Sequence, residues 1–464
     1  MLPWTSVYFQ DSWRALPNLY VQAGVRYEVD QHRYINTTYH DVAPRVSLAW
    51  NPFHDHKTVV RAGFGTYYAP ILRDIENTAA IFDLPGNSRT ETAFMVPLNG
   101  LPGNPAANSA AIFQTLFAQG KINCGTTSPT GCITPADLVP FGINISNSGP
   151  LPPEAFNFGV SPKIQNPYSL QGSLGIEREL APDLSLSANY IYVHTLNLPR
   201  QADANILPGA PVMSGVPGTN GLPFQNWGAP QCQVLVNNPC FVNPLLLSNS
   251  VFFSNAAALY QGGTLELKKR YSRHFTLMAN YTYSKAMDDA LDYSSLPNNQ
   301  VQLAQDRALS SFDQRHRLIV AGIINSPFKS RALAGFELSP VLQYDSARPF
   351  TLYAGTDVNG DHSGFSDRPT GAPRNSGIGP NYIGMDLRLS RRFRITEKAG
   401  LQITAEAFNL ANRTNYATVN DEVGPTFAPS FKVHGSAMLS PSQPLGFTSD
   451  FPKREIQLGA RLSF

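Results

Sequence analysis

The chain ends in Arg454-Glu-Ile-Gln-Leu-Gly-Ala-Arg-Leu-Ser-Phe464, a stretch in which polar and apolar residues alternate without interruption. A period of two predicts a β-strand with one apolar face and one wet face. About ten such residues, tilted, are long enough to cross the hydrocarbon of a bilayer. The last strand of a soluble β-sandwich would show the same pattern, so the rest of the chain has to distinguish the two.

The composition favours a membrane β-barrel over a soluble domain. Charged residues make up 15% of the 464 residues and aromatic residues 11%, whereas an average soluble domain has about 25% charged residues. No continuous apolar run is long enough for a membrane helix. A barrel distributes its apolar surface over alternate residues, which fits both observations. The net charge of +2 indicates no nucleic-acid partner.

The alternating pattern recurs along the whole chain. We predict thirteen strands, at Thr5–Arg14, Leu19–Val29, Arg45–Asn51, Thr58–Tyr68, Tyr168–Glu179, Leu184–Thr195, Val251–Lys269, Phe275–Ser284, Arg315–Ser326, Ala334–Tyr344, Tyr382–Ile395, Gly400–Leu410 and Arg454–Phe464. The connections between them alternate strictly between short turns and long loops. Outer-membrane barrels show this asymmetry, with short periplasmic turns and long extracellular loops, whereas sandwiches and propellers do not.

The sequence therefore predicts an all-β fold, an antiparallel transmembrane β-barrel in which residues 1–464 form one barrel domain. Segments 69–166 and 196–250 are predicted to be long extracellular loops, the first with some folded content. Single-chain barrels have an even strand count, and an odd set would bring its first and last strands together in parallel. Either a strand is hidden in 69–166, giving about 14, or the segment lacks N-terminal strands; the absence of a signal peptide favours the second.

Short motifs, in order along the chain, resemble the barrel of TonB-dependent outer-membrane receptors, and most closely the Oar-like subgroup of the carboxypeptidase-regulatory-like family. They are Tyr8-Phe-Gln-Asp-Ser-Trp13, Pro44-Arg-Val-Ser-Leu-Ala-Trp-Asn-Pro-Phe53, Lys57-Thr-Val-Val-Arg-Ala-Gly-Phe-Gly65, Phe312-Asp-Gln-Arg-His-Arg317, Asp357-Val-Asn-Gly-Asp361 with Asp367-Arg-Pro369, and Phe408-Asn-Leu-Ala-Asn-Arg413. The resemblance covers essentially the whole chain, and the order of the motifs is its most specific part.

The resemblance implies a bacterial outer-membrane location and a full barrel of about 22 strands, of which this chain supplies a part. It also implies contact with membrane lipid and with the barrel assembly machinery, for which the terminal Phe464 would be the recognition signal. Contact with the TonB system would run only through a plug domain that this sequence does not contain. The remaining partner would be an extracellular ligand of unknown identity.

Polar residues on the wet faces of the strands are predicted to point into the lumen. They are Arg26, Glu28, Arg61, Asp386, Arg388, Arg392, Glu406 and Arg461. In the family that the chain resembles, such groups contact the plug. The alternative is simple solvation of a wet wall.

Four cysteines form two local pairs, Cys124 with Cys132 and Cys232 with Cys240, and each pair brackets a loop-like stretch. We predict two loop disulfides in an oxidising compartment. Free thiols in a cytosolic protein are the alternative. Zinc is disfavoured because the chain has no Cys-x-x-Cys and no nearby group of histidines.

The segment 357–367 offers oxygen ligands at alternating positions, from Asp357, Asn359, Asp361 and Ser363. Calcium loops have such spacing, and calcium is the one cofactor that the sequence suggests. A bidentate glutamate at the twelfth position is missing, because Arg368 stands there, so an Asx-rich turn remains the alternative.

No arrangement of nucleophile, base or paired carboxylates is recognisable, and we predict that the chain is not an enzyme. Three functions remain: a TonB-dependent receptor or transporter, a structural or adhesive barrel, and a passive porin. A truncated, non-transporting fragment is a further possibility. The loops carry no recognisable ligand code, so the sequence does not name a substrate.

Overall fold

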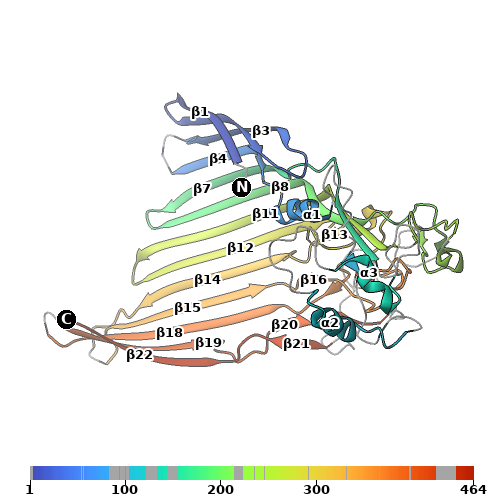
Figure 1. Ribbon diagram of the computed structural model, residues 1–464. Coiled ribbons are helices and arrows are strands. Elements are labelled where there is room, and N and C mark those ends of the chain that lie inside the picture. The colour runs from blue at the N-terminus through green and yellow to red at the C-terminus, as the bar shows by residue number, and fades with distance from the viewer. Residues whose placement is uncertain are drawn as a thin grey trace.

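A computed structural model describes residues 4–464 except 54, 56, 83–92, 95–99, 101–103, 122–132, 144–154, 214–222, 235, 245, 291, 331, 365, 397–398 and 425–445. In this part of the chain a large curved sheet dominates, with short turns at one end of its strands and loops and helices gathered at the other (Figure 1). We call these the turn end and the loop end. The loop end consists of the connections 31–37, 69–167, 204–245, 289–315, 346–381 and 409–454.

The sheet has 16 strands, of which β5, β6 and β13 branch off and the other thirteen form one continuous path. In path order these are β1 (Trp4–Leu16), β2 (Leu19–Asp30), β3 (Thr38–Trp50), β4 (Thr58–Tyr68), β7 (Tyr168–Ala181), β8 (Leu184–Asp203), β11 (Leu246–Ser272), β12 (Phe275–Asp288), β14 (His316–Asn325), β15 (Phe336–Asp345), β18 (Tyr382–Arg394), β19 (Gly400–Phe408) and β22 (Glu455–Ser463). Every step along the path is antiparallel.

The thirteen predicted strands are thus all present and each lies at its predicted place. The two edge strands, β1 and β22, run in the same direction because an even number of antiparallel steps separates them. Among the described residues neither edge has a further strand beside it. The sheet is therefore open, and its two edges cannot pair with each other in an antiparallel way.

The register places the alternating apolar positions of neighbouring strands on one common face. Following partners from strand to strand, this face carries Phe9, Val25, Val46, Phe64, Leu174, Leu265, Tyr281, Leu318, Ile383 and Leu458. Val25 is 41% exposed, Leu462 58% and Leu458 82%, and Leu277 is half-buried. These side chains do not form a protein core, as a surface that faces the hydrocarbon of a bilayer requires.

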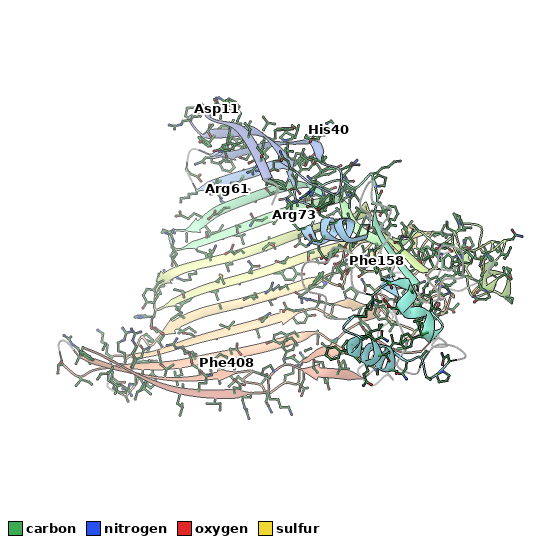
Figure 2. The ribbon with its side chains drawn as sticks, in the orientation of Figure 1. Asp11, His40, Arg61, Arg73, Phe158 and Phe408 are labelled. Atoms are coloured by element: carbon green, nitrogen blue, oxygen red, sulfur yellow. A yellow bond between two sulfur atoms is a disulfide. The ribbon has the colours of Figure 1, made fainter. Side chains whose placement is uncertain are left out.

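Aromatic side chains mark both borders of the apolar face. Trp13 and Trp50, both exposed, lie near the turn end, and Tyr68 and Tyr168, whose ring centroids are 5.5 Å apart, lie at the loop end. Two such girdles at the membrane–water boundaries are typical of outer-membrane barrels, because an amphipathic ring suits the headgroup region. Figure 2 shows side chains standing on both sides of the sheet along its whole length.

Several strands extend beyond the ends that the alternation predicts. β3 begins at Thr38, so half of the predicted connection 30–43 is strand, and β8 and β11 continue to Asp203 and back to Leu246. Polar composition hid these extensions. Asp41 is buried and its carboxylate accepts a hydrogen bond of 2.6 Å from the Asn166 side chain. Above the membrane the sheet contacts loops instead of lipid, so the apolar alternation no longer applies.

The folded part of the loop end is a cap that contains the hydrophobic core of the protein. Its helices are α1 (Arg73–Phe82), α2 (Ser109–Ala118) and α3 (Pro135–Leu138), with 3₁₀ turns η1 (Val139–Phe141), η2 (Pro230–Gln233) and η3 (Leu303–Asp306). Its short strands are β5 (Ala93–Phe94), β6 (Ala155–Val160), β9 (Val212–Met213), β10 (Phe224–Gln225), β13 (Ala308–Leu309), β16 (Pro349–Phe350), β17 (Gly377–Ile378), β20 (Tyr416–Val419) and β21 (Phe447–Asp450). No described helix is long and apolar enough to pass through a membrane.

Three clusters of buried apolar residues hold the cap together. In one, Ile75 and Ala79 of α1, together with Ile71 two residues before the helix, pack against Val160 of β6 and Phe252 of β11. A spacing of four residues puts Ile75 and Ala79 on the same side of the helix. The others centre on Trp227 and on α2 with α3. The predicted loop 69–166 therefore has much folded content, and its strands β5 and β6 branch from the sheet without adding to its path.

A charge on the lipid face should destabilise the sheet more than the same charge one residue away on the other face. Leu174→Arg, in the middle of β7, should lower the free energy of folding into lipid vesicles by about 2–4 kcal/mol. Ser173→Arg is the matched control, because Ser173 is also exposed but lies on the polar face. Urea titration in vesicles measures both. Equal losses for the two variants would contradict the assignment of the faces.

Candidate functional site

The polar face of the sheet carries the residues that the sequence placed in the lumen. The register aligns Arg26 with Tyr8 and Arg388 with Glu406. Following the paired residues from strand to strand between β2 and β22 places four more of the predicted residues on the same side: Arg61, Asp386, Arg392 and Arg461. The positions lie opposite the apolar face throughout. Whether they contact another domain stays a prediction.

Several of these side chains form ion pairs along the face. Arg26 pairs with Glu28 at 2.7 Å, and Arg388 pairs with Glu406 on the next strand at 3.5 Å. Arg61, labelled in Figure 2, pairs with Glu177 at 3.2 Å. The Arg61–Glu177 pair is largely exposed, so it contributes little to stability, on the order of 0–1 kcal/mol. The ion pairs reduce the net charge of the polar face of the sheet.

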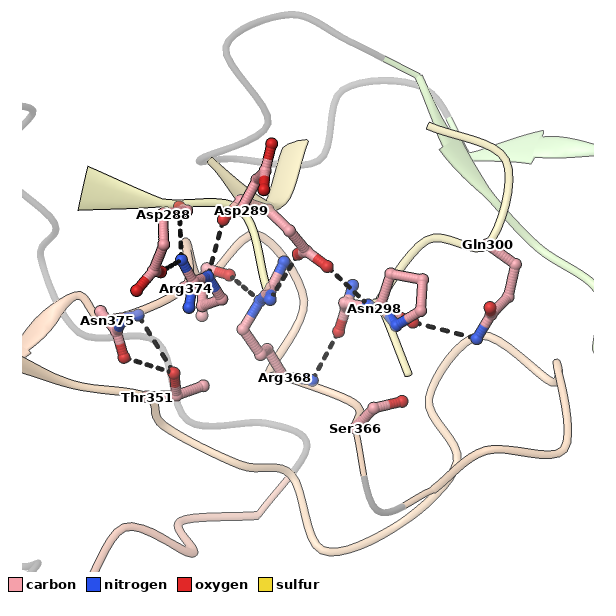
Figure 3. A network of polar contacts seen from close by, with 12 residues as sticks. Asp288, Asp289, Asn298, Gln300, Thr351, Ser366, Arg368, Arg374 and Asn375 are labelled. Carbon is pink, nitrogen blue, oxygen red and sulfur yellow. Dashed lines mark hydrogen bonds and ion pairs between the residues drawn. The ribbon is translucent and has the colours of Figure 1, made fainter. Parts of the chain in front are cut away.

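Above the sheet, a polar network joins loops that are far apart in sequence (Figure 3). The Arg368 guanidinium pairs with Asp306 at 2.8 Å, and both side chains are buried. The Arg374 Nε atom donates to the Asp306 carbonyl oxygen at 2.6 Å, and the guanidinium also pairs with Asp288. Arg200 donates at 2.9 Å to the Asp289 carbonyl oxygen. Burial lowers the pKa of Arg200, although the nearby carboxylates of Asp289 and Asp306 oppose this shift.

A cavity of about 440 Å³ lies against this network. Arg200, Arg368 and Arg374 line it together with Asp289, Asp306 and Asp421. Equal numbers of basic and acidic side chains give the lining no excess of one charge. Serine, threonine and asparagine side chains, the rings of Phe350 and Tyr353, and the apolar Ala290, Leu296 and Pro297 complete the lining. The size and mixed polarity fit a small-molecule site that recognises its ligand by hydrogen bonds and ring contacts.

A second, larger concavity of about 790 Å³ lies where the sheet curves between β1 and β8. Its lining includes Gln10, Arg26, Arg45 and Gln171 from neighbouring strands. It belongs to the wall rather than to the loops. An open curved sheet produces such a groove without any convergence of loops, so the groove by itself does not indicate a ligand site.

The two cysteine pairs differ in what the structure describes. Cys232 and Cys240 form a disulfide with their Cα atoms 5.2 Å apart, as the sequence predicts. Both are buried in the cluster around Trp227, and the bond closes the loop that follows η2. Cys124 and Cys132 lie outside the described residues, so that pairing stays a prediction.

The predicted calcium segment is an ordered loop in which three carboxylates converge. Oxygen atoms of Asp357, Asp361 and Asp367 lie within 4.8 Å of one another. Asn359 has other partners: its side-chain oxygen accepts from the Asp361 N–H at 2.9 Å, and its amide donates to the Asn298 carbonyl oxygen. The Ser363 hydroxyl lies 2.9 Å from that of Ser366. The prediction did not include Asp367. This residue stands at the eleventh position of the loop, one before the twelfth position at which calcium loops carry a glutamate.

Helix α1 is fixed to the top of the sheet by a group of charged residues. Arg73, labelled in Figure 2, pairs with Asp30 at 2.7 Å and with Glu76 at 2.6 Å. The buried His32 imidazole contacts the same two carboxylates, at 3.0 and 3.3 Å. The Arg33 N–H donates to Glu76 at 2.7 Å. The contacts link α1 to the end of β2 and were not foreseen, because Asp30 and Glu76 belong to separate segments of the sequence.

Sequence comparison with family models decides the family. The model described as "Outer membrane beta barrel domain" matches residues 29–372 and 370–457. The chain belongs to this outer-membrane β-barrel family. The barrel is accordingly a protein of the bacterial outer membrane and not an enzyme. A search of curated proteins found no match to its sequence.

Solved structures with the same fold are outer-membrane receptors and transporters. The outer membrane transporter YddB from Escherichia coli aligns with a TM-score of 0.51 and 12% identity, over 99% of this chain and 45% of that one. The siderophore receptor PirA from Acinetobacter baumannii aligns with a TM-score of 0.49 and 10% identity, again over 99% of this chain and 45% of that one. The barrel therefore spans less than half the length of these proteins. At this identity the likeness shows a TonB-dependent-receptor-like fold and nothing about the ligand.

The attachment of α1 should weaken in acid. Burial acts to raise the pKa of Glu76, but hydrogen bonds from the Arg33 N–H, Arg73 and His32 outweigh it and lower this pKa to about 2. Between about pH 4.5 and 2 the unfolded segment binds more protons than the folded one, so stability is lost as the pH falls through this window. Hydrogen exchange of the α1 amides should show protection decreasing below about pH 4.5.

Glu76→Gln is the control for this prediction. The variant should protect α1 less at neutral pH and should lose the decrease between pH 4.5 and 2, because its amide does not titrate there. An unchanged acid profile in Glu76→Gln would show that another group governs the attachment.

Proposed function

We propose that this barrel forms wall strands and ligand-capturing loops of a TonB-dependent outer-membrane receptor that binds or takes up an extracellular solute. The observation that carries the proposal is the convergence of three loop-end segments and the upper end of β8 on one cavity. Arg200 comes from β8, Asp289 and Asp306 from the segment 289–315, Arg374 from 346–381 and Asp421 from 409–454. Loops that meet around a cavity above a membrane sheet provide a place where a solute is held before passage.

The folded cap argues against a passive porin. A porin needs an open mouth, whereas here buried ion pairs and three apolar clusters tie the loops to one another. The alternative of a purely adhesive barrel explains a rigid cap equally well. It does not explain a cavity of about 440 Å³ that polar side chains from separate loops line, because an adhesive surface needs complementarity on its outside.

Energy coupling enters the proposal only through the family resemblance. The described strands and cap contain no plug-like domain that would contact TonB. We propose that coupling requires a plug, as in the receptors that the chain resembles, and that insertion uses the barrel assembly machinery with Phe464 as signal. The assignment to the Oar-like subgroup and the identity of the solute are parts of this proposal that need separate tests.

The proposal requires that the loop end faces the medium. Two phenylalanines provide matched positions: Phe312 at the loop end is 70% exposed, and Phe328 in the turn between β14 and β15 is 58% exposed. In intact cells, Phe312→Cys should react with a membrane-impermeant maleimide and Phe328→Cys should not. After the outer membrane is permeabilised both should react. The reverse pattern in intact cells would show that the orientation is wrong.

Blocking the cavity should abolish solute uptake without unfolding the barrel. Ser311 lines the cavity, and Ser311→Trp should fill much of it. Cells producing the parent barrel together with a plug should deplete at least one small solute from a defined mixture faster than cells without them, and Ser311→Trp should remove this difference. Mass spectrometry of the medium measures the depletion.

Ser330→Trp, at the exposed turn end, is the control and should keep the parent's uptake. A protonophore should stop the parent's uptake if transport is energy-coupled. Uptake that persists with the protonophore and in Ser311→Trp would favour a passive pore and contradict the receptor proposal.

A further inference from the structure

Among residues 357–364, 366 and 367, three carboxylates accept hydrogen bonds from backbone N–H groups of the same segment. Asp357 accepts hydrogen bonds from the N–H groups of Gly360 and His362, at 2.6 and 2.9 Å. Asp361 accepts from the Ser363 N–H at 2.9 Å, and one oxygen of Asp367 accepts from the Val358 and Asn359 N–H groups. The chain thus folds around its acidic side chains and turns them toward a common point.

The carboxylates are not a solvated surface cluster. Asp361 is 1% exposed and Asp367 is fully buried, while Asp357 closes the group on its exposed side. Three negative charges whose oxygen atoms lie within 4.8 Å repel one another strongly in such a place. The Gln300 amide, which donates to Asp361 at 3.2 Å, is a neutral partner and does not compensate the charge.

A second, independent feature points to a missing ligand. The Oδ1 atom of Asp367 is buried and has no hydrogen-bond donor in the described part of the chain. A buried carboxylate oxygen without a partner is costly, and native structures rarely leave one so unless an ion or water fills the place. The neighbouring Arg368 does not serve it, because its guanidinium pairs with Asp306 and with the Ala372 carbonyl oxygen.

We infer that Asp357, Asp361 and Asp367 bind one Ca²⁺ ion at the loop end. Calcium takes six to eight oxygen ligands in flexible geometry, so carboxylates at positions one, five and eleven of a turn suit it, with carbonyl oxygens or water completing the shell. Magnesium fits less well, because it demands a near-ideal octahedron and keeps most of its water. Soft metals are disfavoured by the absence of sulfur and imidazole from this group.

Without a cation the same site is expected to take up a proton. Burial and the charges of Asp367 and Asp357 raise the pKa of Asp361 well above its ordinary value. Burial, with a smaller contribution from Asp357, raises the pKa of Asp367 to about 7 although two N–H groups oppose the shift. Protonated carboxyls are therefore the competing explanation, and the experiment has to separate the two.

The position of the site gives the ion a structural role. The Asn359 carbonyl oxygen accepts from the Gly228 N–H at 2.8 Å, and the Asn359 amide donates to the Asn298 carbonyl oxygen at 2.9 Å. Gly360 approaches so closely that an added Cβ would lie 2.1 Å from the Gly228 nitrogen. The segment is thus packed against two other loops, and Gln300 extends the contact to the end of β8, where it accepts from the Asp203 N–H. An ion here would fasten three loops of the cap.

Terbium luminescence on the folded full chain in detergent tests the inference. Tb³⁺ replaces Ca²⁺ at oxygen sites, and the buried Trp227, whose neighbour Gly228 contacts the segment, should sensitise its emission. Ca²⁺ should displace Tb³⁺ with one site per chain and a dissociation constant of about 10⁻⁴–10⁻³ M, the range of extracellular calcium modules. A tenfold excess of Mg²⁺ over Ca²⁺ should not displace it. Equal competition by Mg²⁺ would overturn the assignment to calcium.

The double variant Asp361→Asn, Asp367→Asn should weaken Ca²⁺ binding at least tenfold, whereas Asp292→Asn, in the neighbouring loop but outside the group, should not change it. Asp357→Asn tests the site from its exposed side, so it keeps the test decisive if the double variant does not fold. Calcium should also increase hydrogen-exchange protection of residues 357–367 in the parent. No saturable binding by the parent, or unchanged binding in Asp357→Asn, would overturn the inference and leave protonated carboxyls as the explanation.

Discussion

The structure depends on one constraint: in hydrocarbon, each backbone N–H and C=O group needs a partner within the protein. Within its path of thirteen antiparallel strands the chain meets this need by pairing each strand with its neighbours, and only the outer edges of β1 and β22 have no partner strand among the described residues. Because neighbouring residues of a strand point to opposite faces, the same pairing separates lipid contacts from water contacts at every second position. The usual hydrophobic core is absent from the membrane part for this reason, and apolar side chains such as Leu458 remain exposed in the isolated chain.

Apolar burial in the ordinary sense resumes only where the strands leave the membrane. There, Ile75 of α1 and Ile71 just before the helix pack with Phe252 of β11, and the cluster around Trp227 includes the Cys232–Cys240 bond. Ion pairs also fix how the loops are placed in the cap, because Arg368 and Arg374 connect their segment to those that contain Asp306 and Asp288. The protein therefore combines two kinds of order: a wall defined by backbone pairing, and a cap defined by side-chain packing.

The wall was largely predictable from the sequence and the cap was not. A period of two survives wherever one face meets lipid, so the predicted strand Thr58–Tyr68 coincides with β4. The same rule failed at β3, whose first residues pair above the membrane and carry buried Asp41. Contacts such as His32 with Glu76, or Arg368 with Asp306, join residues tens of positions apart in loops and short helices, and no periodicity of the sequence indicates which of these segments meet. The sequence could have indicated Asp367 as a ligand. The calcium-loop pattern expects its last carboxylate one position later, so it did not select Asp367.

The length of β8 and β11 has a mechanical consequence. β11 has 27 residues, which at about 3.3 Å each is far longer than a bilayer crossing requires. Together with the 20 residues of β8 it forms a ribbon that begins at the turn end and continues into the cap, where β6 joins it in parallel. A displacement of the cap would therefore be transmitted along this stiff hydrogen-bonded ribbon. If the ribbon tilted, the turns on the opposite side of the membrane would move with it.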